Sequence, residues 1–165
     1  MEEVMRTWGK PWNPEDDAGR GGRERVEMDV RDLPEEPWFE VRSVDGDGSL
    51  KEIVVWPPEG YWEGASVKFS CTFPRDYPYS PPRVRCTTRV FHPSIDMQGY
   101  VSCWVFSLGD WSCERTLTDV VFGLLNLFIY PHTDGPMNFA ASDLLDKDPQ
   151  QFQEMVHRIQ RGNQH

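Results

Sequence analysis

The apolar residues of this sequence follow two different periods, and the pattern changes from the strand period to the helix period after residue 90. At residues 67–73 and 83–90, apolar and polar residues alternate, which is typical of a strand with one buried face. From residue 116 onward, the apolar residues recur at intervals of three and four, which is typical of an amphipathic helix. Consecutive strands followed by consecutive helices favour an α+β fold over an alternating α/β fold.

Turn and cap signals place the individual elements. We expect a short polar helix over residues 23–32, which ends before Pro34 because the residue preceding a proline is disfavoured in a helix. The turn-forming run 45–48 predicts a hairpin. The expected strands are 38–44, 50–56, 67–73 and 83–90, and the expected later helices are capped at Thr116, Asn138 and Asp148.

Composition excludes several classes of function. The net charge of −10 argues against binding to nucleic-acid backbones, because such binding depends on lysine and arginine. No apolar run has the length of a membrane-spanning helix, and the N-terminus lacks a signal-peptide core. The four cysteines lack the spacing of a zinc site or a disulfide framework. We therefore expect reduced thiols, no metal, no cofactor, no membrane partner and a location in the cytoplasm, the nucleus or both.

The glycines, prolines and acidic residues of the first segment cannot easily bury a core. The sequence predicts a flexible arm over residues 1–22, one domain over 23–161 and a tail over 162–165. Four apolar residues of the arm recur at helical spacing, which leaves open a segment that folds on a partner or scattered apolar residues. These are Met1, Val4, Met5 and Trp8.

Several segments together resemble the ubiquitin-conjugating enzyme family in their order and spacing. They are FPRDYPYSPPRVRC, VFHPSID, Gly99, Trp111, TLTDVVFGLLNLF and GPMNFAASDLL. The likeness covers residues 24–160, and the runs EGYWEG, HPSIDMQGYV and GLLNLF are most similar to the neddylation branch of the family. The resemblance implies an N-terminal helix, a four-stranded antiparallel meander sheet and C-terminal helices.

The resemblance also implies a chemistry. Enzymes of this family receive a ubiquitin-like modifier from an activating enzyme as a thioester on one cysteine, and pass it to a substrate lysine, usually with a ligase. A thiolate suits this task because it is a good acyl acceptor and a good leaving group, whereas a serine hydroxyl is a far weaker nucleophile. The implied partners are a ubiquitin-like modifier, an activating enzyme, and a ligase or an active conjugating enzyme.

Two neighbouring residues compete for the acceptor position. The family pattern places the acceptor ten residues after the histidine of a histidine-proline motif and eight residues before a tryptophan. The stretch from His92 to Trp111 is one residue longer than this pattern. Ser102 therefore satisfies the first spacing and Cys103 satisfies the second.

The side-chain pattern favours Ser102. If Ser102 is the acceptor, its apolar neighbours fall on apolar positions of the family pattern; these are Val101, Cys103, Val105 and Phe106. If Cys103 is the acceptor, Ser102 and Ser107 fall on buried positions. Burying a hydroxyl without a partner costs about 1 to 3 kcal/mol. Loops also accept an insertion more readily than packed strands do.

The resemblance assigns further roles. Ser94 replaces an asparagine that supports the oxyanion or its loop in the family, and its shorter side chain loses the reach of the amide. Asp134 matches a segment that flanks the acceptor. We expect His92, Pro93 and Trp111 to hold the loop structurally. The residues expected to meet a partner are Pro57, Pro58, Phe73, Tyr77, Pro81 and Pro82.

The sequence thus predicts a neddylation-type protein that does not cycle a modifier through a thioester. A natural pseudo-enzyme and a cysteine-to-serine substitution that traps an oxyester both fit this prediction. Ser94 favours the natural origin, because a trap needs only one substitution. The alternative is an active conjugating enzyme that carries the modifier on Cys103 and transfers it to a substrate lysine.

Overall fold

Four antiparallel strands form one sheet in the order in which they occur in the chain. The computed structural model describes residues 20–46 and 48–164, and most of the predicted arm lies outside them. The strands are β1 (Phe39–Ser43), β2 (Leu50–Val55), β3 (Val67–Thr72) and β4 (Arg83–Cys86). The helices are α2 (Arg20–Arg31), α3 (Leu117–Ile129), α4 (Phe139–Lys147) and α5 (Pro149–Gly162). The prediction of an α+β fold is confirmed.

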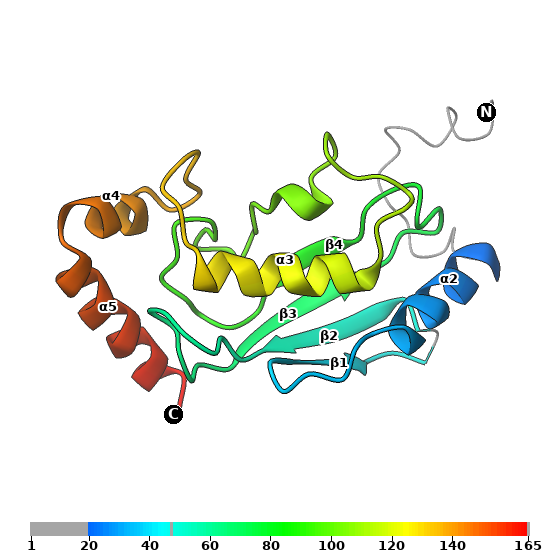
Figure 1. Ribbon diagram of the computed structural model, residues 1–165, viewed down its shortest axis with the longest axis horizontal. Coiled ribbons are helices and arrows are strands. Elements are labelled where there is room, and N and C mark those ends of the chain that lie inside the picture. The colour runs from blue at the N-terminus through cyan, green and yellow to red at the C-terminus, as the bar shows by residue number, and fades with distance from the viewer. Residues whose placement is uncertain (1–19, 47, 165) are drawn as a thin grey trace.

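The core forms where α3 covers one face of the sheet (Figure 1). Ile53 on β2 pairs with Phe69 on β3, and both side chains are fully buried. Leu124 and Phe128 lie one turn apart on α3 and are fully buried as well. Burial of each such side chain contributes about 2 kcal/mol. The switch of apolar period in the sequence therefore marks the two layers that enclose this core.

The helix caps follow the sequence signals. The Asp119 carboxylate accepts the Thr116 N–H at 2.8 Å, which forms the predicted capping box of α3. The side chain of Asn138 caps α4, and that of Asp148 caps α5, each by accepting an N–H at 3.1 Å. Within residues 20–46 and 48–164, no helix has the length and apolar character needed to cross a bilayer.

Strand β4 is shorter than its sequence pattern predicts. Alternation continues to residue 90, but the strand ends at Cys86. The Lys68 N–H on β3 donates to the side-chain hydroxyl of Thr88 at 2.9 Å, whereas the Lys68 carbonyl still accepts the Thr87 N–H at 2.9 Å. Because a hydroxyl takes the place of the backbone acceptor, regular pairing with β3 ends at this point.

Helix α2 begins earlier than its sequence predicts, at Arg20 and not at residue 23. Gly22 lies against the backbone of Arg75, and a Cβ at this position would come within 2.6 Å of the Arg75 carbonyl oxygen. Glycine is therefore needed at this position because the two backbones pack closely. It does not indicate a flexible arm here. Sequence reasoning treated this glycine as a sign of disorder because the contact partner lies far along the chain.

Asp29 joins α2 to two other parts of the fold. Its side chain is only 3% exposed and accepts hydrogen bonds from Arg25 Nε at 2.8 Å, from the Tyr77 hydroxyl and from the Leu117 N–H at 3.2 Å. Arg25 in turn donates to the backbone carbonyl of Arg115 at 3.0 Å. One buried carboxylate thus holds the loop around residue 77 and the start of α3 against α2.

We predict that Asp29→Ala lowers the free energy of unfolding by about 3 kcal/mol, because three donors lose a buried acceptor. Urea denaturation monitored by circular dichroism measures the change. The matched control is Asp143→Ala, which removes an exposed ion pair with Lys147 and should cost less than about 1 kcal/mol. Equal losses in the two variants would contradict the structural role of Asp29.

Candidate functional site

His92 anchors the irregular segment 92–111 to α3. Its ring is fully buried, its Nε2 donates to the Leu127 carbonyl at 2.8 Å, and its Nδ1 accepts the Ser94 N–H at 2.9 Å. The ring also stacks on Trp62, with 4.6 Å between centroids. Burial lowers the pKa of His92 to about 4, although the hydrogen bond to Leu127 opposes this shift. His92 is therefore neutral near pH 7, with both ring nitrogens occupied.

The run after His92 folds back on itself. The Asp96 carboxylate accepts the N–H groups of Gln98 and Tyr100, each at 2.9 Å. Gly99 has a φ of 88°, and a Cβ there would lie 2.2 Å from the Cys86 carbonyl oxygen. Only glycine fits this turn, because L side chains rarely adopt that φ and no space is available. The turn returns the chain beside Ser94.

Ser94 and Pro93 bring two distant segments together. The Ser102 N–H donates to the Ser94 carbonyl at 2.9 Å, and the Pro93 carbonyl accepts the N–H groups of Met137 and Asn138 at 2.8 and 3.1 Å. Ser94 itself is buried. Ser102 and the segment before α4 therefore flank one buried dipeptide.

Ser102 and Cys103 point in opposite directions. The side chain of Ser102 is exposed, whereas that of Cys103 is 5% exposed and packs against α3. A Cβ on Gly123 of α3 would come within 3.3 Å of Cys103 Sγ and within 2.7 Å of Val105. Burial raises the pKa of the Cys103 thiol, which disfavours the thiolate. The outward position in this pair belongs to the serine.

Trp104 lies on the exposed side of the segment, at the start of the 3₁₀ turn η2 (Trp104–Phe106). Its side chain is 59% exposed, and the Arg115 guanidinium lies 4.7 Å from the ring centroid. Trp104 borders a groove of about 440 Å³ that runs along α3, with Trp38 and Phe122 among the lining residues. The segment after Ser102 therefore carries an aromatic side chain held by a cation.

Sequence reasoning missed Gly123, Phe122 and Arg115. Gly123 had a signal, since a glycine inside an otherwise apolar helix indicates a close contact. Phe122 had one as well, because it lies off the buried stripe of α3. Arg115 had no signal, because its contact with Trp104 depends on how the segment folds.

Trp111 joins two loops. Its indole N–H donates to the Pro78 carbonyl at 2.7 Å, and its ring lies 5.9 Å from that of Tyr77. Asp134 is exposed in the turn that ends at Gly135, whose φ is 60°. No hydrogen bond joins Asp134 to Ser102 or Ser94 among the described residues.

Two of the residues expected to meet a partner lie in the interior of the protein. Phe73 and Tyr77 are each 2% exposed and pack edge to face at 4.8 Å, so neither side chain presents a contact surface. The prolines of the same set are buried or half-buried; they are Pro57, Pro58, Pro81 and Pro82. Tyr77 is drawn inward because its hydroxyl reaches Asp29. The exposed aromatic of this loop is Tyr79.

The fold is an α+β domain in which a central helix covers an antiparallel meander sheet. An irregular segment is hydrogen-bonded to that helix and exposes the hydroxyl of Ser102. The family model for ubiquitin-conjugating enzymes matches residues 25–160. The chain belongs to the ubiquitin-conjugating enzyme family.

Individual relatives agree with this assignment. The NEDD8-conjugating enzyme UBC12 of Saccharomyces cerevisiae is 36% identical over 145 residues, covering 85% of this chain and 77% of that protein. The NEDD8-conjugating enzyme Ubc12 of Dictyostelium discoideum is 36% identical over 110 residues, covering 67% of this chain but only 47% of that protein. The solved structure of S. cerevisiae Ubc12 superimposes with a TM-score of 0.78 at 32% identity, covering 83% of this chain and 75% of that one.

We predict that the folded protein loses stability as the pH falls from about 6.5 toward 4, in part through His92. The unfolded chain takes up a proton on this ring near pH 6.5, whereas the folded chain does not until about pH 4. Between pH 7.5 and 5 this difference should cost about 2 kcal/mol, measured as the free energy of unfolding. His92→Gln should remove that part of the pH dependence, and His157→Gln on the exposed face of α5 should not. A slope unchanged in His92→Gln would contradict the buried neutral ring.

We also predict that the native protein reacts rapidly with a thiol reagent at one position. Cys113 is exposed, whereas Cys71, Cys86 and Cys103 are buried. Ellman's reagent should therefore modify one thiol quickly, and Cys113→Ser should abolish this phase. A fast phase that disappears in Cys103→Ser would contradict the burial of Cys103.

Proposed function

We propose that this chain is a neddylation-type protein with Ser102 at the acceptor position, which binds components of the conjugation pathway without cycling a modifier through a thioester. The observation that carries the proposal is the opposite orientation of two adjacent side chains: Ser102 is exposed, and Cys103 packs against α3. The relatives from S. cerevisiae and D. discoideum are named NEDD8-conjugating enzymes, which supports the class of modifier.

The histidine of the Ser102 segment is not available as a base. His92 is the histidine of the same segment, but both its ring nitrogens are hydrogen-bonded and its ring is fully buried. A serine hydroxyl without a base is a weak nucleophile, and its ester is less reactive toward an amine than a thioester. Ser102 would therefore accept a modifier slowly and release it slowly.

Ser94 also argues against efficient transfer at Ser102. Where the family has an asparagine, this chain has a buried serine whose backbone, rather than its side chain, contacts Ser102. In other enzymes, removal of one oxyanion donor lowers the rate by about 100- to 1000-fold. Two departures at one centre support an interaction protein, whether the serine at 102 is natural or was introduced as an oxyester trap.

The partners follow from this proposal. A protein with the family fold and an inert acceptor would still present its surfaces to an activating enzyme, a ubiquitin-like modifier, a ligase or an active conjugating enzyme. Its function would be to hold or compete for these partners. We place this activity in the cytoplasm, the nucleus or both.

The second candidate is an active enzyme with Cys103 as acceptor, which the spacing to Trp111 favours. This function requires the segment to move, because Cys103 Sγ must leave its contact with α3 before it can meet a modifier. The raised pKa of the thiol opposes this role as well.

A loading assay with the activating enzyme, ATP and NEDD8 separates the two candidates. We predict that the unaltered chain forms no adduct that a reducing agent cleaves, and that Ser102→Cys forms one, because a thiol then occupies the exposed position. The control Cys103→Ser, made in both backgrounds, should change neither result. A reducible adduct on the unaltered chain that disappears in Cys103→Ser would overturn the proposal.

Two further outcomes of the loading assay would refine the proposed function. An adduct that resists thiols and is lost in Ser102→Ala would identify an oxyester trap. No adduct on Ser102→Cys would show that Ser94 or Trp104 closes the centre, and Ser102→Cys combined with Ser94→Asn or Trp104→Ala should then restore loading.

A further inference from the structure

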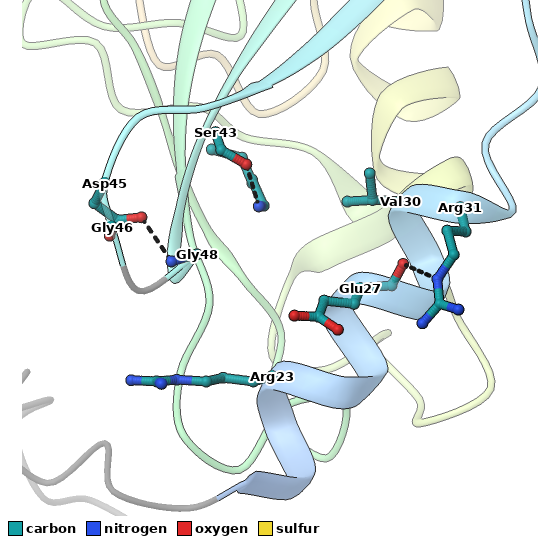
Figure 2. Close-up of a pocket in the computed structure, with 9 residues that line it drawn as sticks. Arg23, Glu27, Val30, Arg31, Ser43, Asp45, Gly46 and Gly48 are labelled. Atoms are coloured by element: carbon teal, nitrogen blue, oxygen red, sulfur yellow. Dashed lines mark hydrogen bonds between the residues drawn. The ribbon is translucent and has the colours of Figure 1, made fainter.

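A second cleft lies outside the segment 92–111, between α2 and the turn that joins β1 to β2. Its volume is about 440 Å³. Figure 2 shows Arg23 and Glu27 reaching from α2 toward the turn, with Asp45 and Gly48 on the opposite wall. None of its lining residues belongs to the site around Ser102.

Lys51 is the buried cation of this cleft. It lies on β2 between Ser43 on β1 and Cys71 on β3, and it is only 6% exposed. Its ammonium donates to the Ser43 hydroxyl at 2.7 Å and forms no ion pair within the described residues. An ammonium has three donors, so two remain for a ligand. Burying a charge without a counter-charge is costly, which makes this position favourable for an anion.

Neither carboxylate of the cleft forms an ion pair with Lys51 within the described residues. The two oxygens of Asp45 instead accept the N–H groups of Gly48 and Leu50 and the hydroxyl of Ser49, at 2.9 to 3.1 Å. Glu27 faces the cleft from α2 but pairs with no cation among the described residues. Two further cations, Arg23 and Arg31, line the same cleft. The cleft thus carries three cations against two carboxylates, in a chain with a net charge of −10.

We propose that the cleft binds a small oxyanion of the phosphate class, anchored by the Lys51 ammonium and the Ser43 hydroxyl. A phosphate has several acceptor oxygens, which match the two remaining donors of the Lys51 ammonium. The anion is either inorganic phosphate or the phosphate of a monoester, since both present the same oxygens to Lys51. This site is independent of the reaction at Ser102.

Titration of the full chain with inorganic phosphate, at pH 7.5 and constant ionic strength, tests the proposal. Nuclear magnetic resonance should show saturable shifts of the Ser43, Gly48 and Lys51 amides. Lys51→Met should weaken binding at least about tenfold, because a charge-assisted hydrogen bond is lost. Glu27→Gln should strengthen binding, because a negative charge is removed from the cleft. The control Lys147→Met, on the exposed face of α4, should leave binding unchanged.

Shifts that do not saturate, or that are the same in Lys51→Met, would overturn the proposal. If Lys51→Met does not fold, Ser43→Ala and Glu27→Gln decide the question, since they must change binding in opposite directions. O-phosphoserine, with serine as its control, identifies the source. Tighter binding than inorganic phosphate assigns the cleft to a monoester, and weaker binding assigns it to the free anion.

Discussion

The hydrogen bonds of the His92 ring hold the irregular part of this structure in place. A segment without regular secondary structure must satisfy its backbone groups by other means, and here the His92 ring and the Asp96 carboxylate accept several of its N–H groups. One ring nitrogen reaches α3 and the other reaches the backbone of Ser94. The Ser94 carbonyl in turn accepts the N–H of Ser102. The exposed hydroxyl of Ser102 is therefore connected to α3 through Ser94 and His92.

The orientation of Ser102 and Cys103 follows from packing against α3. Gly123 leaves space on the helix, and Cys103 and Val105 fill it. Ser102 precedes this inward pair and Trp104 lies between its two members, and the side chains of both are exposed. The thiol that resembles a nucleophile in the sequence is thus a small core residue, in a position where free cysteine is often found.

Much of the fold follows from local signals. The caps at Thr116, Asn138 and Asp148 are where the sequence predicts them, because a capping side chain bonds to backbone only a few residues away. Predictions failed where the partner is distant. The end of β4 depends on a hydroxyl that replaces the ladder opposite Lys68. The start of α2 depends on a contact between Gly22 and Arg75.

By itself, the sequence determined the fold class, the order of the elements and the family, since apolar period and motif spacing are properties of the chain. It also limited the acceptor to two adjacent residues. The tertiary structure decided which side chains are exposed, because exposure depends on the surface that a segment packs against. For this reason Phe73 and Tyr77 lie in the interior, where the Tyr77 hydroxyl bonds to Asp29 of a distant helix, and Lys51 is a buried cation at a cleft that no sequence motif marks.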